Sequence, residues 1–339
     1  MSRAWTRRTF VGGALAAVAS SWWTPSLSPG SPRRRTTPSE LEIQFRWNKF
    51  LSLNTHLRRL ARNPADPPEE YAEAVKVYRH QHFLVPGNDI WFTMESYLAR
   101  ATDLRSVRSQ LRLFPLLFRD LDLQPTGQAL AAAMENALPA FESGEWPALQ
   151  TRKTTSVDPA LKRQFDPLRK KLLQFLFTSL NAEPIDLRRL TIDLVGRYIQ
   201  TGYRSLSIKG PYFTIVETER FPGLDLIETC LMMIARIIEL EDRGNSKGAL
   251  FLLRRRQESL HLPNPAVLPR AILYWTAGEA VRRLIDPGHQ HVGERLQIYR
   301  RAFRPFLPAL AEDWNAYLSG QIGLDEALNG IIRKSGGTV

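Results

Sequence analysis

Apolar residues recur at helical spacing over most of the chain, starting soon after residue 39. The first stripe consists of Phe50, Leu53, Leu57 and Leu60. Residues three or four positions apart lie on one face of an α-helix, so this stripe predicts an amphipathic helix. Ser39 and Glu42 have the spacing of a capping box, which predicts that the helical part begins there. Asn63 and Pro64 predict the end of this first helix.

Similar stripes, separated by proline and glycine turns, predict further helices. Their approximate ranges are 67–80, 103–115, 126–141, 158–181, 185–204, 221–241, 246–261, 266–285, 291–303, 305–318 and 324–334. Only Arg204 to Thr218 has the composition of strands, with two β-prone runs on either side of Lys209-Gly210-Pro211. The pattern therefore predicts a mostly α protein. We expect an irregular multi-helix globular bundle of about a dozen helices, with at most one short β-hairpin near 205–218.

The segment 143–158 is the best candidate for an internal boundary, because it is polar and contains Gly144, Pro147 and several threonines. We therefore divide the chain into a leader at residues 1–38, an N-terminal helical region at 39–142 and a C-terminal helical region at 157–334. The two helical regions are either separate domains or parts of one continuous domain.

The first 38 residues have the features of an export signal. Arg7 and Arg8 precede Phe10 and a mildly apolar stretch that runs to Ala19, an order that resembles the twin-arginine signal peptide. The stretch is shorter than the about 20 apolar residues that a transmembrane helix needs. The resemblance implies export by the twin-arginine translocation machinery to the periplasm or the extracellular space, with no transmembrane span in the mature chain. The alternative is a disordered basic tail.

If residues 1–38 are an export signal, part of the net positive charge belongs to that signal. The chain has 46 basic and 34 acidic residues, a formal net charge of +12. Six of the 46 are arginines within residues 1–38, which leaves 40 basic and 34 acidic groups in the rest of the chain. This smaller excess is spread out and not interleaved with aromatic residues, as it would be on a nucleic-acid-binding face. We therefore expect no nucleic acid partner.

The single cysteine, Cys230, lies in an apolar run. An intramolecular disulfide and a cysteine-based metal cluster are therefore excluded, and we expect a buried, unreactive thiol.

Four of the six histidines occur in two identical tripeptides, His80-Gln81-His82 and His289-Gln290-His291. Neutral imidazole is a common metal ligand, so two such arms that meet would offer four nitrogen ligands to one ion. His289 and His291 follow a Pro-Gly turn, where an extended backbone would place both rings on one face. The alternative is a set of exposed histidines near helix ends. The cofactor is unknown, and a metal is the candidate.

Glu258 is the candidate catalytic residue. It lies at a predicted helix end before a proline turn, and Glu258-Ser259 is similar to the short Glu-Ser motif of lytic transglycosylases. The resemblance extends over residues 256–266 and implies that Glu258 is an acid/base acting on peptidoglycan. Glu258 and His261 also have the Glu-x-x-His spacing of di-iron bundles, of which the chain has no second copy. The alternative is an exposed, helix-terminal glutamate.

Three functions follow from these observations. We prefer an exported binding protein that holds a small molecule or a partner segment in an aromatic-lined cleft. The aromatic candidates for such a cleft are Trp47, Trp91, Tyr97, Tyr198, Tyr203, Tyr212, Tyr274, Trp275 and Trp314. The alternatives are a cell-wall glycan-cleaving enzyme that uses Glu258 and a metal-binding protein that uses the two His-x-His pairs. For His56, on the first amphipathic helix, we expect a purely structural role.

Overall fold

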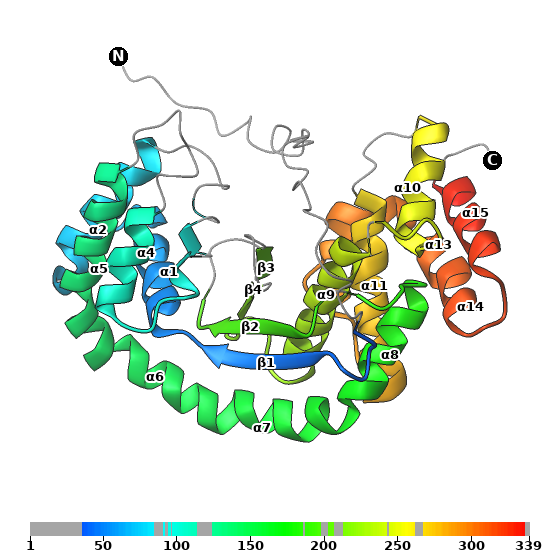
Figure 1. Ribbon diagram of the computed structural model, residues 1–339, viewed down its shortest axis with the longest axis horizontal. Helices are drawn as coiled ribbons and strands as arrows, with labels where there is room; N and C mark the ends of the chain where they lie inside the picture. The colour runs from blue at the N-terminus through cyan, green and yellow to red at the C-terminus, as the bar shows by residue number, and fades with distance from the viewer. Residues whose placement is uncertain are drawn as a thin grey trace, which may run out of the picture. The chain divides into compact units, whose positions relative to one another are not determined.

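Helices dominate the part of the chain that the structure describes, as the sequence predicts (Figure 1). This computed structural model describes residues 36–84, 91, 94–95, 97–113, 124–185, 187–197, 203–206, 213–242, 244–261 and 267–335. Arg7, Arg8 and Phe10 of the predicted export signal lie outside these residues. Residues 35–339 form one compact unit. The division into regions 39–142 and 157–334 stays a prediction.

The first group of helices packs around a core of its own. It comprises α1 (Lys49–Arg62), α2 (Ala72–Leu84), α4 (Leu104–Leu113) and α5 (Gln124–Ser143). Asn48 caps α1, since its side chain accepts a hydrogen bond from the Leu51 amide at 2.9 Å. Leu53, Leu57 and Phe141 are fully buried in the core. The predicted helical stripe at 50–60 is therefore confirmed.

A helical connection occupies most of 143–158, the segment that we proposed as an internal boundary. After Gly144 the chain forms α6 (Glu145–Arg152), α7 (Asp158–Ala160) and α8 (Arg169–Ser179), joined by wide π-helical turns at 153–157 and 161–165 and a 3₁₀ turn at 166–168. Pro159 and Pro167 lie in the first turns of short helical pieces, where a missing amide hydrogen costs nothing. The polar composition of this segment is thus compatible with helix, and the boundary stays a prediction.

A four-stranded sheet holds the two halves of the described chain together. The strands are β1 (Glu42–Trp47), β2 (Arg189–Val195), β3 (Tyr203–Leu206) and β4 (Phe213–Glu217), in the spatial order β1-β2-β4-β3. β1, β2 and β4 are parallel, and β3 pairs antiparallel with β4. The hairpin predicted near 205–218 is confirmed as β3 and β4. The sheet is larger than that hairpin, because β1 and β2 lie where we predicted helices.

Both missed strands have a physical explanation. In β1, Ile43, Phe45 and Trp47 alternate with polar residues, which is the pattern of a strand. The capping box that we predicted at Ser39 and Glu42 is absent, and Thr37 instead bonds the carboxylate of Glu40 in a turn. β2 is buried from Leu190 to Val195, and a short, fully buried run cannot be distinguished from a buried helix by its periodicity.

The second group of helices forms a larger core. It comprises α8, α9 (Leu224–Glu241), α10 (Ala249–Ser259), α11 (Val267–Leu284), α12 (Val292–Arg295), α13 (Leu307–Ala309), α14 (Asn315–Leu318) and α15 (Leu324–Lys334). Trp314 is fully buried here and donates a hydrogen bond to Thr276 at 2.9 Å. Among the described residues, no helix has both the length and the apolar character that crossing a membrane requires.

The sheet contributes to both cores. Leu194 packs in the second core, whereas its neighbour Val195 packs in the first, because successive strand residues point to opposite sides. The arrows of β1 and β2 point toward α1 in Figure 1, so the carboxyl ends of these strands meet the first group of helices.

Candidate functional site

A small pocket lies beside the carboxyl edge of the parallel strands. It is lined by Ser52, Thr55, His56, Arg59, Phe141, Glu145, Leu149, Gly196 and Arg197. Gly196 and Arg197 directly follow β2, and α1, which carries the first four of these residues, begins just after β1. The carboxyl edge is where open parallel sheets bind ligands. We call this cavity the sheet-edge pocket.

The α1 residues of the pocket share one face of the helix. Ser52, His56 and Arg59 are separated by four and three positions, which places their side chains side by side. Every α1 residue from Phe50 to Arg58 is buried. The polar residues of this face are therefore largely covered by α5, α6 and the sheet edge.

Two buried polar atoms in this pocket lack a hydrogen-bond partner. The Ser52 side chain is 2% exposed and its Oγ has none, and His56 is 9% exposed and its Nε2 has none. Thr55, between them, donates its hydroxyl hydrogen to the Ser52 carbonyl at 2.9 Å. Buried polar side chains are nearly always hydrogen-bonded, so each exception needs an explanation. The purely structural role that we expected for His56 does not account for its free nitrogen.

The other side of the His56 ring is held firmly. Its Nδ1 lies 3.2 Å from a guanidinium nitrogen of Arg59 and 3.8 Å from a carboxylate oxygen of Glu145. The rings of Tyr71 and Phe141 flank it, with centroid distances of 4.9 and 5.7 Å. Interaction with His56 is the main cause that holds the pKa of Glu145 below its usual value, against the opposing effect of burial. Glu145 is therefore ionised at neutral pH.

A second ion-pair group closes the pocket at the strand ends. Glu219, which follows β4, pairs with Arg197 and also with Arg152 of α6 at 3.0 Å. Gly196 is required by close packing, because a Cβ there would lie 2.5 Å from a methyl carbon of Leu149. The pocket thus combines guanidinium groups, an imidazole and a hydroxyl beside two paired carboxylates.

We compared the chain with known protein families, with curated proteins and with solved structures. None of the three comparisons finds a match. The chemistry of the pocket therefore has to follow from its own residues.

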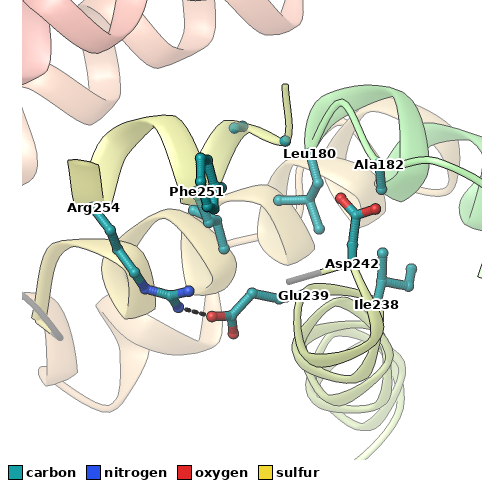
Figure 2. Close-up of a pocket in the computed structure, with 10 residues that line it drawn as sticks. Leu180, Ala182, Ile238, Glu239, Asp242, Phe251 and Arg254 are labelled. Atoms are coloured by element: carbon teal, nitrogen blue, oxygen red, sulfur yellow. Dashed lines mark ion pairs between the residues drawn. The ribbon is translucent and has the colours of Figure 1, made fainter. Parts of the chain in front are cut away.

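A second cavity lies between the end of α8, the end of α9 and the start of α10 (Figure 2). Figure 2 shows Arg254 reaching toward Glu239, beside the apolar side chains of Leu180 and Ile238. One carboxylate oxygen of Glu239 pairs with Arg254 and the other with Arg236. The carboxylate of Asp242 accepts hydrogen bonds from the Glu183 amide at 3.2 Å and from the Asn245 side chain at 3.0 Å. The charged groups of this cavity are thus engaged in internal contacts.

Two of the four predicted metal ligands form internal contacts with other side chains. His289 Nε2 lies 2.6 Å from a carboxylate oxygen of Glu228, and His291 Nε2 lies 3.2 Å from one of Glu279. His291 Nδ1 is also 3.2 Å from the hydroxyl of Tyr299. These pairs hold the segment before α12 against α9 and α11.

The structure says less about the first histidine pair, His80 and His82. His80 is exposed on α2, and the side chain of His82 lies outside the described residues. The described part of the chain contains no group of three histidine, cysteine, aspartate or glutamate side chains that could hold a metal ion. Metal binding by His80, His82, His289 and His291 stays a prediction.

Glu258 is exposed near the end of α10 and lines neither of the two cavities above. Glu258 raises the pKa of the Arg254 guanidinium, but burial of Arg254 lowers that pKa by more. Residues 262–266, which complete the motif similar to lytic transglycosylases, lie outside the described residues. The catalytic role of Glu258 stays a prediction.

Most of the aromatic candidates belong to the cores. Trp91, Trp275 and Trp314 are buried there, while Tyr198 and Tyr212 lie outside the described residues. The rings that do flank the pocket, Tyr71 and Phe141, were not among our candidates. Cys230 is fully buried, and burial raises the pKa of its thiol, as expected for an unreactive cysteine.

Proposed function

We propose that this protein is a binding protein that holds a small polar molecule in the sheet-edge pocket. The observation that carries the proposal is the pair of buried, unpartnered atoms, Ser52 Oγ and His56 Nε2, on residues that line one cavity. A buried polar group without a partner costs roughly 1–3 kcal/mol, and a ligand that bonds both groups would recover this cost. The position at the carboxyl edge of the sheet supports the same function.

Binding agrees with this geometry better than nucleophilic catalysis does. A serine nucleophile and its histidine base lie within hydrogen-bond distance of each other. Ser52 Oγ and His56 Nε2 each lack any hydrogen-bond partner, so they do not bond each other. Two polar residues that line one cavity without bonding each other are the arrangement that orients a ligand.

We also propose that the protein reaches the ligand outside the cytoplasm, through the twin-arginine pathway. The support is the order Arg7-Arg8, Phe10 and apolar stretch. Cell fractionation tests it. The wild-type chain should appear shortened in the exported fraction, and the double variant Arg7→Lys, Arg8→Lys should stay at full length in the cytoplasm. An unshortened wild-type chain that stays in the cytoplasm would contradict export.

Binding can be tested without knowing the natural ligand. Protein purified from its native compartment under non-denaturing conditions should retain a small molecule in native mass spectrometry, and acetate, phosphate or acetamide should raise its melting temperature. His56→Phe keeps a ring of similar size but removes both nitrogens and should abolish both effects. His80→Phe, at an exposed histidine of α2, is the matched control. Absence of a retained molecule together with no response to any probe would refute the proposal.

A further inference from the structure

We infer that α6 is a lid over the sheet-edge pocket, which turns about Gly144 to admit the ligand and then closes on it. This inference rests on the binding function proposed above and describes how that same site is regulated. The starting point is the size of the pocket, whose volume in this structure is about 10 Å³. A space of this size holds about one water molecule, so a larger molecule enters only if a wall moves.

Three of the four walls are fixed by their packing. Every α1 residue from Phe50 to Arg58 is buried, and Phe141 of α5 is fully buried in the first core. Gly196 and Arg197 directly follow β2, which is paired on both sides within the sheet. Displacing any of these elements would disrupt a close-packed core or the strand pairing.

The fourth wall, α6, is held much less firmly. Of its eight residues, only Leu149 is buried. The opposite side of the helix is exposed at Pro147, Ala148 and Thr151, so α6 covers the pocket as a single layer. Segments with few buried contacts are the ones that open most readily.

A break in the helical backbone lies at each end of α6. Gly144, with φ −106° and ψ −83°, separates it from α5, and no side chain caps its first turn there. A rotation at this point therefore breaks no capping hydrogen bond. At the other end α6 continues into the π-helical turn Lys153–Val157, a geometry that often occurs at functional sites. Gly144 is the better hinge, because it is exposed.

Two ion pairs, one at each end of α6, connect the lid to the rest of the site. A carboxylate oxygen of Glu145 lies 3.8 Å from Nδ1 of His56, and a guanidinium nitrogen of Arg152 lies 3.0 Å from a carboxylate oxygen of Glu219. Ion pairs that are partly exposed to solvent contribute little stability, so these two can break and re-form.

Leu149 is the apolar contact that closes the lid. It is 4% exposed, and one of its methyl carbons lies where a Cβ at position 196 would be only 2.5 Å away. The missing side chain of Gly196 therefore provides the space that Leu149 fills. When α6 turns outward, Leu149 leaves this space, and the pocket enlarges beside the unpartnered atoms of Ser52 and His56.

A reversible lock tests whether α6 must move. The full chain with Leu149→Cys and Gly196→Cys is oxidised to tie the lid to the strand end, while the fully buried Cys230 stays unreactive. The chain is labelled with ¹⁵N at its histidines and titrated with acetate, phosphate or acetamide while the His56 resonances are followed by NMR. We expect binding to be lost in the oxidised form and restored by dithiothreitol. Leu149→Cys alone, treated identically, is the control and should bind in both conditions.

Hydrogen exchange detects the opening in the wild-type chain itself. In the unliganded protein the amides of α6 should exchange about tenfold faster than those of α5, and a bound probe should slow them. Glu145→Gln removes one connection of the lid and should speed the exchange of α6 further. Glu142→Gln, three residues earlier and paired with Lys49, is the matched control and should leave the exchange of α6 unchanged.

The possible results separate the lid from the binding function. Probes that bind the oxidised form as tightly as the reduced form, or α6 amides that exchange as slowly as those of α5, would overturn the lid and leave the binding function standing. If the wild type binds no probe and the purified protein retains no small molecule, the binding function fails. The exchange measurement on the wild type decides the lid even if the cysteine pair itself prevents binding.

Discussion

Arg46 and Asp193 occupy paired positions on two neighbouring parallel strands and form a bidentate ion pair across them. The Nε and one terminal nitrogen of Arg46 lie 2.7 and 2.9 Å from the two carboxylate oxygens of Asp193, which is fully buried. Burial raises the pKa of Asp193, and Arg46 opposes that rise. Arg46 therefore supplies a charged partner to a carboxylate that is buried inside the sheet that supports the pocket.

Replacing Arg46 should lower the free energy of unfolding. Arg46→Ala leaves the Asp193 carboxylate without its charged partner, and breaking a buried ion pair typically costs about 3–5 kcal/mol. We expect the lower end of this range, since the Arg46 side chain is 34% exposed. Urea unfolding measures the loss. The double variant Arg46→Ala, Asp193→Asn should recover part of it, and an unchanged midpoint in Arg46→Ala would contradict the prediction.

Removing the unpartnered hydroxyl should have the opposite effect. Ser52→Ala deletes a buried group without a hydrogen bond, so the unliganded protein should gain up to about 1 kcal/mol of unfolding free energy. Thr55→Val, one turn further along α1, deletes a hydroxyl that bonds the Ser52 carbonyl and should destabilise the protein. A Ser52→Ala variant that is clearly less stable than the wild type would mean that the hydroxyl is satisfied.

The packing at Gly196 should tolerate no side chain. In Gly196→Ala the new methyl group would lie 2.5 Å from a methyl carbon of Leu149, and overpacking of this kind typically costs about 1–3 kcal/mol. Leu149→Ala in the same chain should relieve the contact, so the two substitutions should be less harmful together than their sum. Gly244→Ala, where nothing lies within 4 Å, is the control. Thermal unfolding of the wild type, the two single variants, the double variant and Gly244→Ala gives the comparison.

The buried pair of Glu279 and His291 should make the fold sensitive to acid. Burial raises the pKa of Glu279, but its interactions with His291, Arg283 and Arg282 outweigh burial and hold the pKa below its usual value. A depressed carboxylate pKa contributes stability above the unfolded value of about 4.3, and this is lost as the pH falls through the folded value. Urea unfolding between pH 3 and pH 6 should show a steeper acid loss in the wild type than in Glu279→Gln.

The sequence predicted the helices well because their signal is local. The stripe at 50–60 is visible within one or two turns, and the structure contains it as α1. β1 and β2 pair with each other over a separation of about 150 residues, and no local pattern carries that information. The hairpin of β3 and β4 was found because its two strands are close in sequence.

The site was missed for a related reason. The stripe of Phe50, Leu53, Leu57 and Leu60 predicted a helix with one buried face, and for His56 we expected a purely structural role. Leu51 gave a signal against this, since it lies outside the stripe of Phe50, Leu53 and Leu57 and implies that a second side of the helix is also covered. Which elements cover that side is decided by α6 and the end of β2, far away in the sequence. The sequence also did not reveal the partners of His289 and His291, because Glu228 and Glu279 come from other helices.

The placement of Ser52, His56 and Arg59 on one helix also limits how the gene can change. Each α-helical residue rotates the chain by about 100°, so one codon inserted between positions 52 and 59 would turn the later side chains away from the earlier ones. Single substitutions in this stretch alter one contact each, whereas a deletion or insertion would dismantle the whole set. The turn at 63–68, which lies beyond the end of α1, can vary in length without that penalty.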